Sequence, residues 1–167
     1  MIVSISQPAY LPWLGYFDRI AESDVHIVLD QVPLERSSTT RFTNRNKVRG
    51  SDGVQWLTVP VKGASTQPLI RDTAIDNEQR WQARHRRTLE QSYRKAPHFA
   101  SVEDLLSLSF DRSWDSLGEL LAVQRKWLLS ALGVTTRIEI GSQLHVPGSK
   151  SELILNLCSA VGASTYL

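Results

Sequence analysis

Cysteine is nearly absent from this sequence of 167 residues, in which Cys158 stands alone. A single cysteine excludes a disulfide within the chain, and a domain of this length buries roughly two-thirds of its unfolded surface without such a staple. Cys158 ends the apolar run 153–158, so we expect a small buried hydrophobic residue rather than a reactive thiol. The chain is therefore expected to fold around an ordinary hydrophobic core in a reducing compartment.

Long hydrophobic runs are missing too. No stretch approaches the ~20 apolar residues that span a bilayer, and the first residues lack the charged start and long apolar centre of a signal peptide. Residues able to bind metals do not gather at ligand spacing, and the common glycine-rich phosphate motifs and the Gly-x-Ser-x-Gly elbow are absent. We expect a cytoplasmic protein without membrane insertion, without a metal site and outside the common nucleotide-binding and hydrolase classes.

Neither sign of charge dominates, because 19 lysines and arginines face 17 aspartates and glutamates, for a formal net charge of +2. That surplus is too small to indicate nucleic-acid binding by itself. The basic residues are nevertheless concentrated in two segments, 36–49 and 80–95. We expect two local basic patches and, as the partner, a small anionic substrate.

The first thirty residues predict a strand, a helix and a second strand. Residues 2–6 are an apolar run that ends before Pro8, which favours a buried strand. Apolar residues recur at helical spacing from Trp13, and Pro12 suits the first helical position. The apolar run 25–29 completes a unit whose strands should pair in parallel through a right-handed crossover.

The rest of the chain continues this alternation. The polar, basic segment 31–53 is too long for an idle connection and indicates a functional loop or hairpin. Further strands are expected over 55–61, 136–140 and from Thr165, and helices over 78–95, 101–108, from 113 or 115 up to Gly133, and over 151–161. This order predicts one α/β domain over residues 1–167, a Rossmann-like three-layer domain with a mostly parallel sheet.

The connection after the first strand is the leading candidate for a ligand site, because ligands of parallel sheets bind where strands end and helices begin. It holds stacking faces, a glycine that permits close backbone approach, and a helix start suited to an anion. The alternative is that its aromatic residues only pack the helix on the sheet. The predicted binding residues are Gln7, Tyr10, Trp13, Gly15 and Tyr16.

Basic and amide side chains between the second and third strands form a second candidate, with a solvated loop as the alternative. Donors of this kind suit phosphate or carboxylate, and we select Arg41, Asn44, Arg45 and Lys47. Asp30 ends the second strand, where a carboxylate either meets a ligand or forms a turn.

Two helices supply the remaining candidates. His85 follows Trp81 by one helical turn, so the two can face one pocket with His85 as general acid or base; a hydrogen-bonded structural histidine is the alternative. His26 lies in an apolar strand and is expected to be structural. Ser149 and Lys150 start the last predicted helix, where they suit either an anion or ordinary N-capping.

Five segments together resemble the WbqC-like protein family, and the resemblance runs from Ser4 to the end of the sequence. They are Gln7-Pro8-x-Tyr10-x-Pro12-Trp13-x-Gly15-Tyr16-Phe17, Leu29-Asp30, Asn44-Arg45-Asn46-Lys47, Trp56-Leu57-Thr58-Val59-Pro60-Val61 and Tyr93-x-Lys95-Ala96-Pro97-His98-Phe99. The arrangement is also distantly similar to HIGH-type nucleotidyltransferases, although Pro12 and Tyr16 stand where that signature has histidines.

The resemblance implies a transferase-like protein of bacterial surface-polysaccharide biosynthesis of the O-antigen type. It implies aminoacyl transfer, such as that of glycine, to a nucleotide-linked amino sugar, with ATP or a sugar nucleotide as cofactor. A non-catalytic binding or assembly protein of the same pathway is the alternative. Relatives are expected to continue past Leu167, so this chain is expected to lack a C-terminal part, and the sequence leaves its oligomeric state open.

Overall fold

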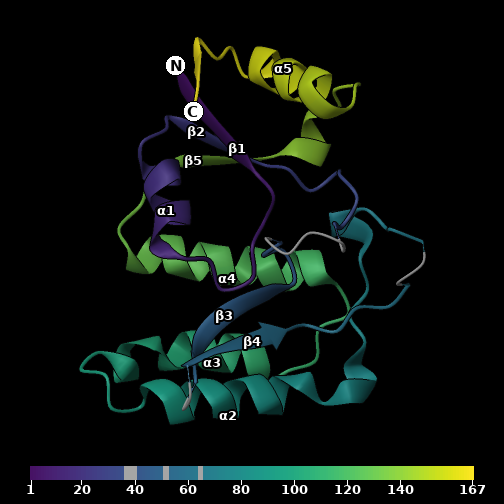
Figure 1. Ribbon diagram of the computed structural model, residues 1–167. Helices are drawn as coiled ribbons and strands as arrows, with labels where there is room; N and C mark the ends of the chain where they lie inside the picture. The colour runs from purple at the N-terminus through teal and green to yellow at the C-terminus, as the bar shows by residue number, and fades with distance from the viewer. Residues whose placement is uncertain (36–40, 51–52, 64–65) are drawn as a thin grey trace.

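The computed structural model describes residues 1–35, 41–50, 53–63 and 66–167 and confirms an α/β fold (Figure 1). Its central sheet has four strands in the order β5-β2-β1-β6, and every neighbouring pair is parallel. The strands are β1 (Ile2–Ser6), β2 (Val25–Val28), β5 (Arg137–Ile140) and β6 (Thr165–Tyr166). The predicted parallel unit is therefore confirmed, with Val3 beside Val25 in the register of β1 and β2.

Helices cover both faces of this sheet and make the three layers of a Rossmann-like fold (Figure 1). Val3 and Ile5 of β1 pack against Leu153 and Leu157 of α5 (Lys150–Ala160) on one face. The opposite face carries α1 (Leu14–Ala21) and the end of α4 (Leu117–Ala131), where Ile20 shares a cluster with Leu129.

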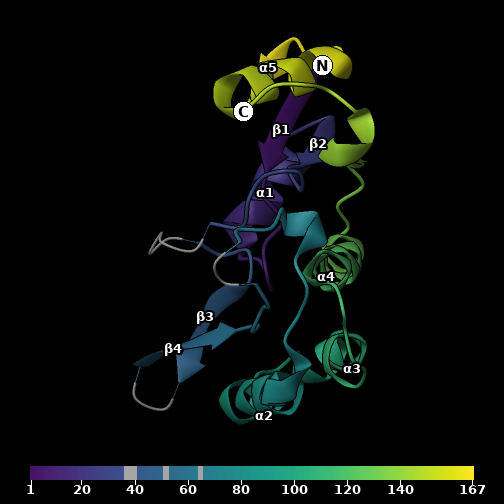
Figure 2. The ribbon, with the colours of Figure 1, turned by 90° about the vertical axis from the view of Figure 1, so that its right-hand side faces the viewer.

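A separate antiparallel hairpin lies below the sheet in Figures 1 and 2, beside two helices. It consists of β3 (Arg45–Gly50) and β4 (Gly53–Thr58), and the helices are α2 (Trp81–Tyr93) and α3 (Glu103–Phe110). The strand predicted at 55–61 thus begins two residues earlier and ends three residues earlier, and residues 45–50 of the predicted loop or hairpin form the first strand of the hairpin. Residues 36–40 and 51–52 of that segment lie outside the described residues.

Helix α4 connects these two parts of the molecule, as Figure 2 shows. Its first half contributes Leu117 and Leu121 to the core under the hairpin, and its second half contributes Leu129 to the core beside α1. Ser116 caps it by accepting a hydrogen bond from the Glu119 backbone at 3.4 Å. In the described part of the chain, no helix is long and apolar enough to cross a membrane.

Several predicted helix ends were wrong by a few residues. Helix α1 begins at Leu14 after Trp13, so Pro12 precedes the helix instead of starting it. Ser101 does not cap a helix, because it lies within the 3₁₀ turn Phe99–Val102 that leads into α3. The other 3₁₀ turns are Ile70–Asp72, Asn77–Gln79 and Gly141–Leu144.

Candidate functional site

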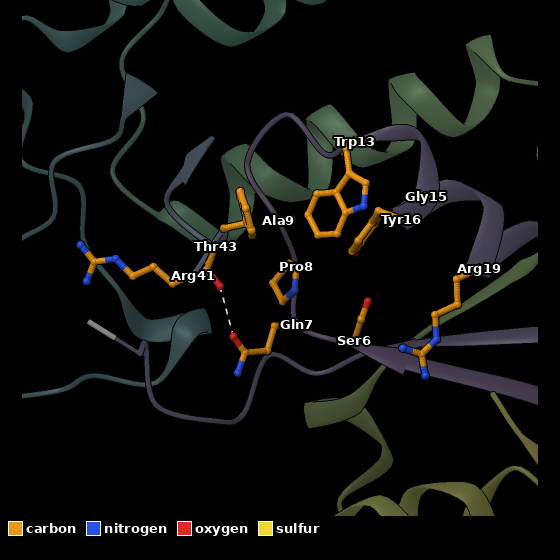
Figure 3. Close-up of a pocket in the computed structure, with 11 residues that line it drawn as sticks. Ser6, Gln7, Pro8, Ala9, Trp13, Gly15, Tyr16, Arg19, Arg41 and Thr43 are labelled. Atoms are coloured by element: carbon orange, nitrogen blue, oxygen red, sulfur yellow. Dashed lines mark hydrogen bonds between the residues drawn. The ribbon is translucent and has the colours of Figure 1, made fainter. Parts of the chain in front are cut away.

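A cavity of about 390 Å³ opens at the carboxyl end of β1, where the chain turns into α1. The chain leaves β1 for β2 through α1 on one face of the sheet, and reaches β6 from β5 through α5 on the other. Neighbouring strands with connections on opposite faces form the switch point at which such sheets bind ligands. We call it the β1–α1 cavity; Ser6, Gln7, Pro8, Ala9, Trp13, Gly15, Tyr16, Arg19, Arg41, Phe42 and Thr43 line it (Figure 3).

An aromatic wall forms one side of the β1–α1 cavity. Trp13 remains 49% exposed, yet its ring lies 5.0 Å from that of Phe42 and 5.9 Å from that of Tyr16. An indole held by two neighbouring rings but open to solvent offers a stacking face at little entropic cost. Gly15 makes room for it, because a Cβ there would lie 3.2 Å from the Trp13 Nε1 atom.

The polar groups of this cavity are cationic or neutral. Arg19 and Arg41 lie at opposite ends of the group in Figure 3. Between them, Thr43 donates a hydrogen bond to the Gln7 side-chain oxygen at 3.2 Å. Since the described residues that line it include two arginines and no carboxylate, the cavity favours an anion.

A buried polar layer lies behind the cavity, on the face of the sheet that α1 covers. The Ser6 hydroxyl is 3.4 Å from His26 Nε2, and the Ser4 hydroxyl is 2.8 Å from Nδ1. Burial, reinforced by the charges of Arg125 and Arg19, lowers the pKa of His26 to about 3. The neutral imidazole of His26 is therefore separated from the β1–α1 cavity by the Ser6 hydroxyl. The sequence predicted only a structural role for it.

The backbone of this loop is held in an unusual conformation. Leu11 has φ of +42°, in the left-handed region that a leucine rarely adopts. Its N–H donates to the Gln124 side chain at 3.2 Å, and its carbonyl accepts from Asn46 at 2.6 Å. Two buried amides on α4 and β3 thus fix the loop from beneath and position Trp13 at the cavity.

The model of the WbqC-like protein family matches residues 7–167 of this chain. The chain belongs to the WbqC-like protein family. It is 36% identical over 168 residues to the uncharacterized protein Rv1507c of Mycobacterium tuberculosis, covering 99% of this chain and 71% of that protein. No solved structure matches the chain.

In this WbqC-like protein, five predicted binding residues come together in the β1–α1 cavity, and two others meet the catalytic candidate His85 elsewhere. Gln7, Trp13, Gly15, Tyr16 and Arg41 line the cavity. Tyr10, Trp81 and His85 instead form a buried cluster under the hairpin, where the Tyr10 hydroxyl and His85 Nδ1 share a hydrogen bond of 2.8 Å.

His85 is 1% exposed, and burial with the nearby Arg84 charge lowers its pKa to about 4, against a hydrogen bond to the Thr58 backbone. The expected pairing of His85 with Trp81 is present, with ring centroids 5.2 Å apart. A role for His85 as acid or base stays a prediction.

The remaining candidates have structural contacts outside this cavity. Arg45 and Lys47 lie over the Trp56 ring at 4.2 and 5.1 Å. Asn44 is buried and donates to the Val59 carbonyl at 2.9 Å. Asp30 accepts from the backbone and hydroxyl of Ser142 at 2.9 and 2.7 Å. Ser149 and Lys150 are exposed at the start of α5, on the opposite face of the sheet.

Sequence reasoning did not select Ser6, Arg19, Phe42 or Thr43 as site residues. Arg19 had a usable signal, because it follows Gly15 by four residues and so shares its side of α1. Phe42 and Thr43 lie inside the selected segment 41–47, but only its charged and amide residues are typical of an anion site. Their place depends on the Tyr10 N–H donating to the Phe42 carbonyl at 2.9 Å, a long-range pairing that no local pattern encodes.

Proposed function

We propose that this WbqC-like chain is a transferase-like protein that binds a nucleotide-linked sugar in the β1–α1 cavity. The proposal rests on a half-exposed Trp13 ring in a cavity that Arg19 and Arg41 also line and to which no carboxylate among the described residues contributes. An aromatic ring of the ligand stacks on Trp13, and its phosphates are neutralised by the two arginines. The volume of about 390 Å³ lies within the ordinary range for small-molecule sites.

The reaction we propose is the one that the family resemblance suggests, aminoacyl transfer to a nucleotide-linked amino sugar in cytoplasmic steps of surface-polysaccharide biosynthesis. Such chemistry depends mainly on positioning and on stabilising negative charge. The fixed loop between Gln7 and Gly15 serves the first task, and the arginines serve the second. Ser6 offers the route by which His26 can exchange a proton with a bound group.

A second candidate function is ligand binding without turnover, as an assembly protein of the same pathway. The composition of the cavity favours it, because none of the described residues that line it is a histidine, a cysteine or a carboxylate. His26 lies behind Ser6 and His85 lies in another core cluster.

Isothermal titration calorimetry with uridine diphosphate N-acetylglucosamine tests the binding proposal. Trp13→Ala and Arg19→Gln should each weaken binding by about tenfold or more, because each removes roughly 1.4 kcal/mol of stacking or charge pairing. Arg112→Gln is the matched control, since Arg112 is exposed and lies over Trp114 at 3.8 Å. If Arg112→Gln weakens binding as much as Arg19→Gln does, the cavity is not the site.

Turnover distinguishes the two candidate functions. The protein is incubated with ATP, glycine and nucleotide amino sugars, and the products are analysed by mass spectrometry. A product heavier than the acceptor by glycine less one water, formed with cleavage of ATP by wild type and lost in Ser6→Ala, supports the transferase. Binding without any new product supports the assembly protein.

A further inference from the structure

A second cavity of about 290 Å³ lies on the other side of Pro8, at the carboxyl ends of three adjacent strands. Pro8 follows β1, Val28 ends β2 and Ile140 ends β5, and these strands are neighbours in the sheet. The start of α4 forms the opposite wall. We call it the α4 cavity; Pro8, Val28, Asp30, Ile70, Arg71, Ser116, Gly118, Glu119, Ala122, Arg125 and Ile140 line it.

Arg125 is the feature of this cavity that packing does not explain. Its side chain is 8% exposed, and no hydrogen bond or ion pair joins it to any residue within the described ranges. Burial lowers the pKa of Arg125, and electrostatic interactions with Tyr16 and Asp30 oppose this shift. The guanidinium nitrogens keep some contact with solvent. A guanidinium that is largely withdrawn from water without a partner is still costly, so such groups are normally paired with an anion.

The anionic groups nearby do not supply that partner. The Asp30 carboxylate accepts hydrogen bonds from Ser142 on both oxygens, and within the described residues no hydrogen bond or ion pair joins it to Arg125. Glu119 is exposed at the start of α4, and no ion pair between it and Arg125 is present in the described part of the structure. Arg71 adds a second positive charge, with Asp72 3.5 Å away as its partner.

The shape of α4 leaves room for a ligand above Arg125. Gly118, Ala122 and Arg125 follow at intervals of four and three residues and therefore share one side of the helix. The first two are small, so their side chains take little of the cavity volume of about 290 Å³, and the Arg71 backbone lies close over Gly118, its Cα 3.5 Å from where a Cβ would stand. The Gly118 N–H, in the first turn, has no acceptor among the described residues.

We propose that the α4 cavity binds a phosphate or carboxylate group between the buried Arg125 guanidinium and the first turn of α4. The guanidinium binds two oxygens of such a group side by side, and the Gly118 N–H at the positive end of the helix dipole donates to it. This site is separate from the β1–α1 cavity and does not rest on the function proposed for it.

The test uses inorganic phosphate and acetate as probes, with ¹⁵N NMR of the whole chain. Phosphate binding should shift the Gly118 amide resonance and saturate, and acetate titrated in parallel decides whether the group is a phosphate or a carboxylate. Arg125→Met removes the charge while filling a similar volume, and it should weaken the preferred anion at least about tenfold. Lys126→Met, the exposed neighbour on the same helix, should leave it unchanged within about twofold.

The stability of Arg125→Met separates a ligand site from a structural arginine. Without added anion, the variant should have a melting temperature equal to or above that of wild type, because it loses an unpaired buried charge. Added phosphate or acetate should then stabilise wild type but not the variant. The proposal fails if neither anion shifts Gly118, or if Arg125→Met melts well below wild type while it still binds the anion. Trp13→Ala should leave anion binding at the α4 cavity intact. Failure of the α4 proposal is therefore distinguishable from failure of the function proposed for the β1–α1 cavity.

Discussion

Two buried histidines show how the same residue type serves this molecule in different surroundings. His26 is bonded to Ser4 and approaches the cavity through Ser6, whereas His85 is bonded to Tyr10 inside a core of aromatic rings. Burial is the largest cause of the lowered pKa in both, so both imidazoles are neutral in the folded protein near pH 7. Each therefore couples folding to pH.

For His85 this coupling gives a signed prediction. The unfolded chain binds a proton at a pKa near ~6.5, but the folded chain binds it only near pKa about 4. Between these values the unfolded state holds more protons, so stability falls as the pH falls, by ~1.4 kcal/mol per pH unit for this group. Its contribution is fully present above the unfolded pKa.

Urea denaturation of wild type and His85→Gln between pH 7 and pH 4 measures the effect. The difference between their free energies of unfolding should narrow as the pH falls through this range, because only wild type loses the His85 contribution. Tyr10→Phe is the control, since it removes the hydrogen bond and keeps the imidazole, and its difference from wild type should stay constant. A constant difference for His85→Gln would show that this imidazole is not held neutral.

Gly15→Ala tests whether the position of the Trp13 indole matters. The added Cβ would lie 3.2 Å from Nε1, so the ring must shift, while helix propensity favours alanine over glycine by about 1 kcal/mol. Stability should hold, but binding of the nucleotide amino sugar should weaken roughly five- to tenfold. Gly118→Ala is the matched control, because its Cβ would meet only ordinary contacts of 3.5 Å and beyond. Equal calorimetric affinities for Gly15→Ala and wild type would contradict the stacking role.

The sequence predicted the core of the β1–α1 cavity because its chemistry is local. A strand end, an exposed tryptophan and a glycine lie within one short segment, so Gln7, Trp13 and Gly15 could be selected without knowing the fold. Arg125 could not, because on a helical wheel it is one more basic residue of α4. Its burial follows from the packing of α4 against the sheet, which is a long-range property.

At the scale of elements, the spacing of apolar residues and the positions of proline and glycine predicted where strands and helices lie. They predicted the ends of these elements less well. β1 was predicted with its observed bounds because Pro8 marks its end. The hairpin was less clear because the polar residues Arg45, Asn46 and Lys47 resemble a loop. They form a strand because Val48 of β3 and Leu57 of β4 are buried on one side of the hairpin, against α2 and α3.

The caps of α4 and α5 offer a matched comparison between two serines at the same helical position. Ser116 accepts a hydrogen bond from the Glu119 backbone, whereas Ser149 makes no side-chain capping bond. Ser116→Ala should therefore lower the free energy of unfolding by about 0.5–1 kcal/mol. Ser149→Ala should change it by less than about 0.5 kcal/mol, as surface substitutions usually do. Equal losses in urea denaturation would mean that the α4 cap is not formed.

At the scale of the whole molecule, α4 is the element that joins the separate hydrophobic cores. The core under the hairpin and the core beside α1 contact opposite halves of this one helix, and the third core lies across the sheet under α5. The sequence predicted a single domain from its length, the absence of a linker and the alternation of strands and helices, which cannot reveal how separate cores are coupled. If α4 and the sheet couple them, damage to any core should lower the stability of all three.

Leu157→Ala tests this coupling at the largest distance that the chain offers. Leu157 is fully buried between α5 and the sheet, and its truncation should cost about 2–5 kcal/mol. Of the five tryptophans, Trp81 and Trp114 are buried in the core under the hairpin. The test therefore uses a chain in which the other three are replaced by phenylalanine, so that fluorescence reports on the far side of the molecule.

With one cooperative unit, the fluorescence transition in urea should move to lower concentration together with the circular dichroism transition. Leu155→Ala, on the same helix but 66% exposed, is the control and should move neither transition appreciably. A fluorescence transition that stays in place while circular dichroism shifts would show that the sheet and the hairpin core unfold separately. The chain would then consist of two folding units joined by α4, with the β1–α1 cavity lying where they meet.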